Sequence, residues 1–477
     1  MTVSSSPAFA AQDSSTSHPS VGNSADRAPK YFTLPSLREQ VTIQDGWTKE
    51  RRNRIPKILQ KYGVDAWLIS QKEYAEETVF WSLKSAKQFS ARRRTTTLFI
   101  ANPTKGSPSS YTWIDNTPKV WESVKEVLSR QKPASIAIDT HPQIAFSSGL
   151  HAGELDALKE GLGKEWASKL VSQPMIAVEY IATMPQSRAE WYGKLQSTAW
   201  AMISEAFSES VIEPGVTTTT DVEWWLRDKI QAMNYTTWFH PDVTIIDEHA
   251  WNLSSTSSSS SFLKEDELTT TEEKNVIHQG DLLHVDFGVT ALGLNTDTQH
   301  LAYVLPLSQT DIPASLLAGL KKANRAQDIV LSHLQVRRTG NEILKDVLAQ
   351  LKKENITAKV YSHPIGDWGH GAGALIGMTN LQDKVPVLGD LAVLKGMYYS
   401  IELLVEHYVE ERDVMLRFPV EEDVRWVPSA SSKEDDDDDK GTWVWAYGGR
   451  QEKFHIIQSR SGKEGDGGVA GFGSGDL

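Results

Sequence analysis

Acidic residues interrupt apolar, strand-like segments in the C-terminal half of this chain. In DLLHVDFGVTALGLNTDTQHLAYVL (281–305), Asp286 stands at the end of one apolar run and a second β-like run carries Asp297. Glu402 lies within YYSIELLV and Glu421 within FPVEEDVRWV. β-Strands contain few Asp residues, and the burial of an unpaired carboxylate is costly. A divalent cation would compensate these charges, so the pattern predicts a metal site built on β-structure.

The spacing of the two aspartates predicts that they share one face of a sheet. Asp297 follows Asp286 by 11 positions, and Gly288 and Gly293 bracket the segment between them. A hairpin-like connection lets two adjacent antiparallel strands present both side chains on one face. Without a cation the two carboxylates would repel each other and one would bind a proton. A single Asp at a strand end is usually a turn or cap residue, and only the whole acidic set favours a metal site.

A histidine in a glycine-rich segment completes the predicted ligand set. His370 lies in Gly369-His370-Gly371-Ala372-Gly373, where small residues let a backbone approach a ligand closely. The segment lacks the GxGxxG spacing and the Lys-Ser/Thr pair of a phosphate-binding loop. A packed histidine in a glycine-rich turn is the alternative interpretation.

Composition limits the chemistry and the partners. The chain has no Cys, so it has no thiolate ligands, and a metal must be bound by His and carboxylates. A net charge of −13 argues against a nucleic-acid partner, because phosphate binding favours a basic face. No apolar run approaches the ~18 residues of a membrane span. The N-terminus has no basic start and no apolar stretch of signal-peptide length. We therefore expect a cytoplasmic protein, with secretion as the alternative.

The order of the predicted elements indicates an α+β chain with two domains. Residues 1–44 are expected to be a disordered or extended tail. In residues 45–184, strand-like runs such as VDAWLIS (64–70) alternate with helical stretches, which predicts a small α/β domain. Residues 185–461 are predicted to form the larger domain, which carries the acidic residues.

Two insertions and one helix start are expected within the larger domain. The Ser-rich segment at 252–275 and the acidic block at 431–441 are predicted to be surface insertions, and residues 462–477 a Gly-rich tail. Thr220 and Glu223 have capping-box spacing and predict the start of a helix.

These residues together resemble the metal-binding pattern of the M24 metallopeptidases. That family includes creatinase, prolidase, aminopeptidase P and methionine aminopeptidase, and its catalytic domain has the "pita-bread" fold. Its ligand order is Asp, Asp, His, Glu, Glu, which is matched by Asp286, Asp297, His370, Glu402 and Glu421. The preceding segment, notably GVDAWLIS, resembles the creatinase-type N-terminal domain of the family, and the likeness spans roughly residues 45 to 460.

The resemblance implies a dinuclear metal-dependent hydrolase of short peptides, of the Xaa-Pro dipeptidase or aminopeptidase kind. Asp286 would bind one divalent ion, Asp297 and Glu421 would bridge, and His370 and Glu402 would complete the other position. A metal-bridging hydroxide would attack the scissile carbonyl. Oxygen ligands with one imidazole suit Mn²⁺, our first expectation, as well as Co²⁺ or Zn²⁺. The family also implies a homodimer.

Two positions depart from the pattern of the family's peptidases. They usually carry a His seven residues after the ligand His, and here that position is Gly377; they carry an Arg three residues after the second Asp, and here it is His300. These departures motivate an alternative in which the same fold and metals catalyse C–N hydrolysis of a small non-peptide metabolite. A non-catalytic binding relative is a third reading.

The remaining histidines supply candidates for proton transfer. His249, with His240 as a rival, is the candidate for the His that the family places before its first ligand, and His363 is another possible shuttle. A competing alignment places Asp367 at the ligand position that we assign to His370. We therefore predict His363 and His249 as catalytic residues.

Overall fold

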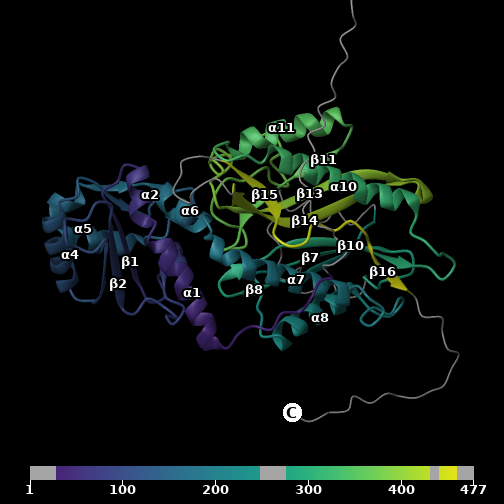
Figure 1. The fold of residues 1–477 in the computed structure, drawn as a ribbon, viewed down its shortest axis with the longest axis horizontal. Helices are drawn as coiled ribbons and strands as arrows, with labels where there is room; N and C mark the ends of the chain where they lie inside the picture. The colour runs from purple at the N-terminus through teal and green to yellow at the C-terminus, as the bar shows by residue number, and fades with distance from the viewer. Residues whose placement is uncertain (1–27, 248–274, 430–439, 459–477) are drawn as a thin grey trace, which may run out of the picture.

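The computed structural model describes residues 28–247, 275–429 and 440–458, which form two large sheets and one two-stranded sheet, with helices packed on the large sheets (Figure 1). The predicted α+β class is confirmed. Most of the insertions predicted at 252–275 and 431–441, and the Gly-rich tail, lie outside these ranges. Within them, no helix combines the length and the apolar character that crossing a membrane requires.

The first sheet belongs to the N-terminal α/β unit and has the strand order β3-β2-β1-β4-β5. The central strand β1 pairs antiparallel with β2 and parallel with β4. The strands are β1 (Ala66–Lys72), β2 (Arg94–Ile100), β3 (Ser110–Ile114), β4 (Ile136–Ile138) and β5 (Leu170–Ser172). The helices are α1 (Leu37–Arg52), α2 (Ile55–Lys61), α3 (Thr78–Leu83), α4 (Lys119–Gln131), α5 (Ala152–Ala167) and α6 (Pro174–Ala182).

Alternating side chains of β1 bury both faces of this sheet. Trp67 and Ile69 pack into a core with α2 and α6, whereas Ala66 and Leu68 pack into a core with α4 and α5. Successive residues of a strand point to opposite faces, so a continuous apolar run such as AWLIS is what a strand between two helical layers requires.

Two helix starts differ from the predicted ones. Helix α1 begins at Leu37, within the predicted tail, because Ser36 and Glu39 form a reciprocal capping box. Helix α8 (Thr219–Ala232) is capped by Thr218 with Asp221 rather than by Thr220 with Glu223. Both pairs have the same spacing, and capping satisfies the free N–H groups of the first turn in either register.

The second sheet has nine strands and carries the predicted acidic ligands. Six strands follow the order β11-β13-β14-β10-β7-β6, while β12 pairs with β13, β15 with β14 and β16 with β10. Their bounds are β6 (Asp242–Ile245), β7 (Leu282–Phe287), β10 (Thr298–Leu305), β11 (Ala358–Val360), β12 (His363–Ile365), β13 (Tyr398–Val409), β14 (Val414–Pro428), β15 (Gly441–Trp445) and β16 (His455–Gln458). The short strands β8 (Thr290–Ala291) and β9 (Leu294–Asn295) pair between β7 and β10, which confirms the predicted hairpin-like connection.

Two pairs of helices cover the outer side of this sheet (Figure 1). Helices α7 (Ala189–Ala206) and α8 pack on Leu283, Val285 and Phe287 of β7. Helices α10 (Ala314–His333) and α11 (Gly340–Lys353) pack on Ile401 and Leu403 of β13. Since side chains alternate along a strand, Asp286 and Glu402 point away from these helices, to the face that lies between the two helical layers.

Candidate metal centre

The register of four neighbouring strands places the site residues in one row across the sheet. Asp286 of β7 is paired with Gln299 of β10, Gln299 with Glu421 of β14, and Glu421 with Glu402 of β13. Residues that are directly opposite in a sheet point to the same face. The sheet therefore gathers three of the predicted carboxylates without contribution from a loop.

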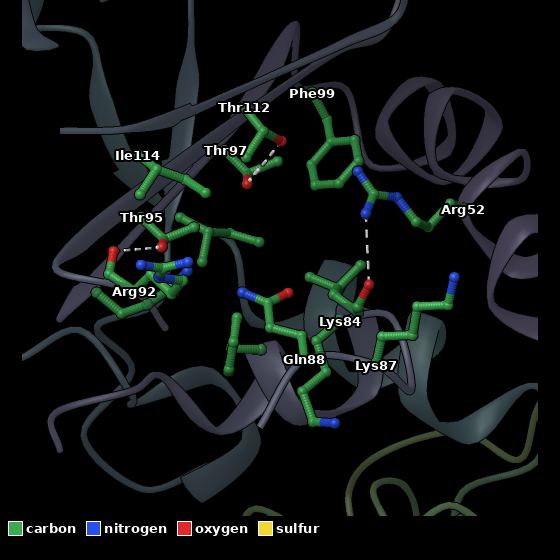
Figure 2. A pocket seen from close by; sticks show the side chains of 14 residues that line it. Arg52, Lys84, Lys87, Gln88, Arg92, Thr95, Thr97, Phe99, Thr112 and Ile114 are labelled. Carbon is green, nitrogen blue, oxygen red and sulfur yellow. Dashed lines mark hydrogen bonds between the residues drawn. The ribbon is translucent and has the colours of Figure 1, made fainter. Parts of the chain in front are cut away.

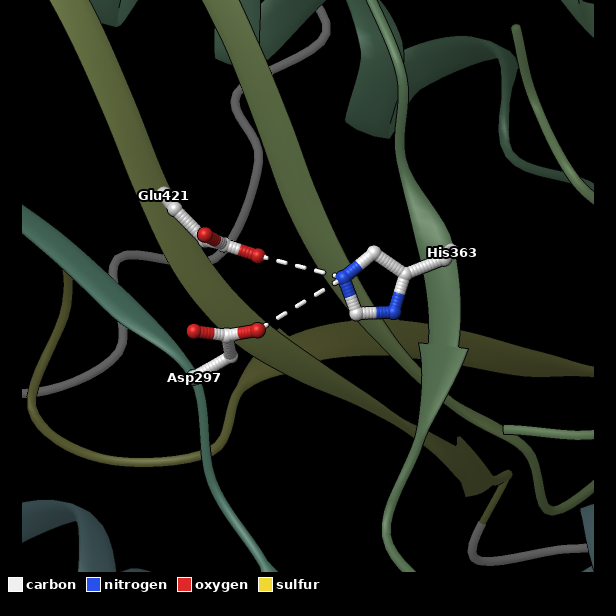
Figure 3. Close-up of side chains that lie close together, drawn as sticks. All are labelled: Asp297, His363 and Glu421. Atoms are coloured by element: carbon white, nitrogen blue, oxygen red, sulfur yellow. Dashed lines mark ion pairs between the residues drawn. The ribbon is translucent and has the colours of Figure 1, made fainter. Parts of the chain in front are cut away.

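Asp297 and His363 also point toward this row of side chains. Asp297 immediately precedes β10, and β12 pairs with β13 so that His363 lies opposite Ser400. Figure 3 shows Asp297, His363 and Glu421 converging, with His363 Nε2 3.3 Å from Glu421 Oε1 and 3.7 Å from Asp297 Oδ2. His363 Nε2 also lies 3.9 Å from a carboxylate oxygen of Glu402.

Two groups of potential ligand atoms share Glu421. The first is Asp297, His363 and Glu421, and the second is Asp286, Glu402 and Glu421; within each group the atoms lie within 4.8 Å of one another. Asp297, His363 and Glu421 are buried, while Asp286 and Glu402 are half-buried. A carboxylate common to two such groups is the arrangement expected of a ligand that bridges two metal ions.

The electrostatics of the cluster favour a bound cation. Burial, followed by the charge of Glu421, raises the pKa of Asp286, Asp297 and Glu402 well above the ordinary value. Asp286 Oδ1 and His363 Nε2 are buried atoms without a hydrogen-bond partner. Unpaired buried polar atoms are unfavourable. A divalent cation in each group would pair with one of these atoms and favour the charged form of the carboxylates.

The imidazole of His363 is oriented as a metal ligand. Its Nδ1 lies 3.0 Å from the carbonyl oxygen of Pro364. A carbonyl only accepts hydrogen bonds, so Nδ1 carries the proton and Nε2 presents its lone pair to the carboxylates. A backbone carbonyl that fixes the tautomer in this way is the usual support of a metal-bound histidine.

The residues predicted as ligands are brought together with one change. The four carboxylates lie in the two groups, and among the described residues it is His363, and not His370, that joins Asp297 and Glu421 in the first group. His370 lies beside the cluster, with its ring centroid 4.7 Å from that of His363 and 5.0 Å from that of Trp238. Burial and then the neighbouring His363 lower the pKa of His370. With His363 in the ligand order, His370 occupies the position seven residues later that was assigned to Gly377.

Asp367, the competing ligand candidate, is engaged elsewhere. Its carboxylate forms ion pairs with Arg51 of α1 at 2.9 Å and with Arg188 at 2.6 Å. Burial would raise the pKa of Asp367, but the charges of Arg51 and Arg188 outweigh burial and hold that pKa below its usual value. The carboxylate therefore serves as the counter-ion of two buried guanidinium groups.

Two further histidines named from the sequence, His300 and His240, belong to neither ligand group. His300 is buried against Glu422, at 2.7 Å, and His455, at 3.1 Å. His240 is partly exposed and lies 3.5 Å from Glu223. His249 lies outside the described residues. Gln299, which was not predicted from the sequence, lies between Asp286 and Glu421 in the row. Its position two residues after Asp297, on the same face of the strand, is the signal that could have indicated it.

A cleft lies next to His370, between the two units. It has a volume of about 550 Å³, and its walls include Trp81, Lys84, Trp238, Trp368 and His370. A separate basic pocket of about 310 Å³ lies on the N-terminal sheet, where Arg52, Lys84, Lys87 and Arg92 surround Thr95 and Phe99 (Figure 2). The basic pocket contains none of the predicted site residues, so the first cleft is the candidate substrate site.

A sheet that carries a row of carboxylates on one face and pairs of helices on the other is the arrangement of the pita-bread fold. Comparison with solved structures confirms the fold. X-Pro aminopeptidase from Thermotoga maritima aligns with a TM-score of 0.53 at 12% identity, over 84% of this chain and 100% of that chain. Dipeptidase PepE from Mycobacterium ulcerans aligns with a TM-score of 0.52 at 14% identity, over 87% and 98%. Xaa-Pro dipeptidase from Bacillus anthracis aligns with a TM-score of 0.51 at 13% identity, over 86% and 99%.

The sequence of the C-terminal part is similar to one family. Residues 194–426, just under half of the chain, match the family model described as metallopeptidase family M24. No curated protein matches the chain in sequence.

Proposed function

We propose that the protein is a dinuclear, metal-dependent peptidase that hydrolyses short peptides, with Xaa-Pro peptides as the first substrates to test. The observation that carries the proposal is the pair of ligand groups that share Glu421. Oxygen ligands with a single imidazole suit Mn²⁺, Co²⁺ or Zn²⁺, and we expect Mn²⁺.

The ligand assignment follows the two groups. Asp297 and His363 would hold one ion, Asp286 and Glu402 the other, and Glu421 would bridge them. This assignment differs from the one implied by the resemblance, in which Asp297 also bridges and Glu402 lies with the histidine. When bound, the ions would supply Lewis acidity, which lowers the pKa of a water molecule and polarises a peptide carbonyl. The protein's own contribution is to fix these ligands on strands, where neighbouring hydrogen bonds limit their movement.

We assign to His370 a role in binding the substrate. It lines the cleft and lies beside the ligand groups without belonging to either of them. A neutral imidazole in that position can donate a hydrogen bond to a carbonyl or accept one from an amide. The indole rings of Trp81, Trp238 and Trp368 offer flat apolar walls that suit a pyrrolidine ring, and two of the aligned structures are named as Xaa-Pro peptidases.

The histidine assignment is tested with three variants. His363→Ala should lose bound metal and activity together, while His370→Ala should keep its metal and lose turnover. His278→Ala, an exposed histidine, is the matched control and should resemble the wild type. Metal content is measured by elemental analysis after dialysis. If His370→Ala lost metal and His363→Ala retained it, His370 would be the ligand, as the sequence alone predicted.

The substrate class is tested separately. The Mn²⁺-loaded protein should hydrolyse some members of a panel of Xaa-Pro dipeptides and Xaa-Pro-initiated tripeptides faster than matched Xaa-Ala peptides. Metal-loaded protein that cleaves no peptide would favour C–N hydrolysis of a small non-peptide metabolite, or a binding role. The homodimer and the cytoplasmic location also stay proposals, and sedimentation of the purified chain tests the first of them.

A further inference from the structure

The basic pocket of the N-terminal unit lies on one face of three neighbouring strands. Strand pairing places Gln71 of β1 opposite Thr95 of β2, and Thr95 opposite Ile114 of β3. Residues that are directly opposite in a sheet point to the same face, and all three line the pocket. Phe80 and Leu83 of α3 line it as well. The pocket is therefore a hollow over a sheet face, and its volume of about 310 Å³ suits a small molecule.

The charge of the lining has one sign. Four of the 14 lining residues are Lys or Arg and none is Asp or Glu, although the net charge of the chain is −13. Among the described residues, none of these four cations forms an ion pair. Arg52 and Arg92 stand on opposite sides of the pocket (Figure 2). Burial lowers the pKa of Lys84, and the attraction of Asp45 only partly offsets this effect. A bound anion would balance the positive charge.

The loop that carries three of these cations is held at both ends. Asp45 of α1 accepts a hydrogen bond from the backbone N–H of Ala86 at 2.8 Å. Glu76 accepts one from the backbone N–H of Ala91 at 3.0 Å. The backbone of residues 84–92 is therefore positioned without a ligand, which lowers the entropic cost of binding one.

A buried amide gives a second, independent indication of a ligand. Gln71 is only 2% exposed, and its Oε1 has no hydrogen-bond partner. The hydroxyls on the same floor already have partners: Thr97 and Thr112 bond to each other at 3.2 Å, and Thr95 donates to the carbonyl oxygen of Arg92 at 3.1 Å. A buried acceptor without a partner is unfavourable. The expected ligand thus carries a hydrogen-bond donor as well as a negative charge.

We propose that the basic pocket binds a small organic phosphate. Its phosphate would pair with the cations, a hydroxyl or amino group would donate to Gln71 Oε1, and its apolar body would contact Phe80 and Phe99. A phosphate monoester carries a charge of about −1.5 to −2 at pH 7 and three acceptor oxygens, which suits several cations better than a single carboxylate does. No lining residue belongs to the two ligand groups of the second sheet, so this binding site goes beyond the proposed peptidase function.

The experiment is a calorimetric titration of the full-length chain with AMP, which combines a flat ring, hydroxyl groups and one phosphate. Adenosine lacks the phosphate and inorganic phosphate lacks the body. Each titration is made with metal-free and with Mn²⁺-loaded protein. AMP should bind in both states, about tenfold or more tightly than either fragment, because hydrogen bonds to charged groups are strong.

Two variants and a control assign the binding to the pocket. Arg92→Gln removes one exposed cation and should weaken AMP by about tenfold. Gln71→Met keeps the size of the side chain, removes the unpaired acceptor and should also weaken AMP. Arg130→Gln is the matched control, since Arg130 is exposed and pairs with Glu126 on α4, which packs on the opposite face of the same sheet. Circular dichroism checks that each variant folds.

Each of the other outcomes would overturn the proposal. These are no binding of AMP at millimolar concentration, or equal binding by the wild type and Arg92→Gln. Inorganic phosphate that binds as tightly as AMP would indicate an adventitious ion only. Binding confined to the Mn²⁺-loaded protein would place AMP at the metal groups. None of these measurements uses turnover, so a failure of the proposed peptidase function would leave them unchanged.

Discussion

Replacement of Asp367 by Asn should destabilise the protein without removing its metal. Asp367 lies between two guanidinium groups whose side chains are 2% and 5% exposed, Arg51 of α1 and Arg188. Arg51 also donates to the carbonyl oxygen of Tyr180 at 2.8 Å. The substitution keeps the size of the side chain and removes its charge, so the two buried cations lose their counter-ion while the packing stays nearly the same.

The magnitude follows from the cost of leaving a buried charge unpaired. A unit charge pair about 4 Å apart contributes about 4 kcal/mol at an effective dielectric constant of about 20. Two such pairs are opposed by the desolvation of three ions and by the repulsion between Arg51 and Arg188. Removal of one partner from a buried ion pair typically costs about 3–5 kcal/mol. We expect the free energy of unfolding to fall by that amount and the melting temperature to fall by about 10 °C.

Urea unfolding and differential scanning calorimetry measure this loss, and elemental analysis measures the metal content of the same samples. Asp390→Asn is the matched control, because Asp390 forms an exposed pair with Lys384 and such pairs contribute little. The pKa of Asp367 is held below its usual value, so its stabilisation should be present at neutral pH and be lost as the pH falls below about 4. A variant that unfolds like the wild type but no longer binds metal would refute this reasoning and make Asp367 a ligand.

Three further predictions concern other parts of the molecule. Burial raises the pKa of Asp139 to about 6, and burial with the charge of Asp139 raises the pKa of Glu77. Both groups hold their protons more tightly in the folded chain, so their contribution to stability should be greatest below about pH 4 and should be lost as the pH rises through 6. Thermal melts at several pH values should show a smaller fall in Glu77→Gln, which donates to Asp139 without a titratable proton. Gly377→Ala should lower stability by more than about 1 kcal/mol, because Gly377 has a φ of +78° and a Cβ there would lie 2.0 Å from the carbonyl oxygen of Val360; a melting temperature equal to that of the wild type would contradict this. Removal of metal with a chelator should lower the melting temperature, and added Mn²⁺ should restore it. A ligand that binds only the folded chain stabilises it by about 4 kcal/mol when its free concentration is a thousandfold above Kd. An unchanged melting temperature after proven removal of the metal would argue that the carboxylates are neutral in the folded protein.

The carboxylates of the site could be predicted because they contradict their surroundings. Asp286 and Glu402 stand in apolar strands where only a bound ion or a proton makes them tolerable, and that conflict is visible in the sequence. The spacing of Asp286 and Asp297, together with the alternation of side chains along a β-strand, was sufficient to predict that carboxylates share one face of the sheet. The hairpin between β7 and β10 followed from the glycines that bracket it.

The proposal of His363 rather than His370 as the ligand could not be made from the sequence in this way. His363 and His370 both stand next to small residues or Pro, and the glycine-rich context favoured His370. In the structure, a Cβ on Gly369 would lie 2.1 Å from the ring of Trp238, so this glycine makes room for an indole. The deciding contact is the pairing of His363 with Ser400, which joins segments far apart in the chain and leaves no local signal.

The N-terminal unit takes part in forming the candidate substrate site through the loop that carries His370. Asp367 of this loop is bound by Arg51, and Trp368 Nε1 donates to Ser82 Oγ at 3.1 Å. Trp81 and Lys84, next to Ser82, line the cleft that His370 also lines. Because the loop is fixed by ion pairs and a hydrogen bond to the N-terminal unit, the distance from the metal groups to the far wall of the cleft depends on both units. The two ligand groups themselves come from the strands of the second sheet and from Asp297, which immediately precedes β10. We therefore infer that changes in the N-terminal unit alter which substrates fit while the metal content stays the same.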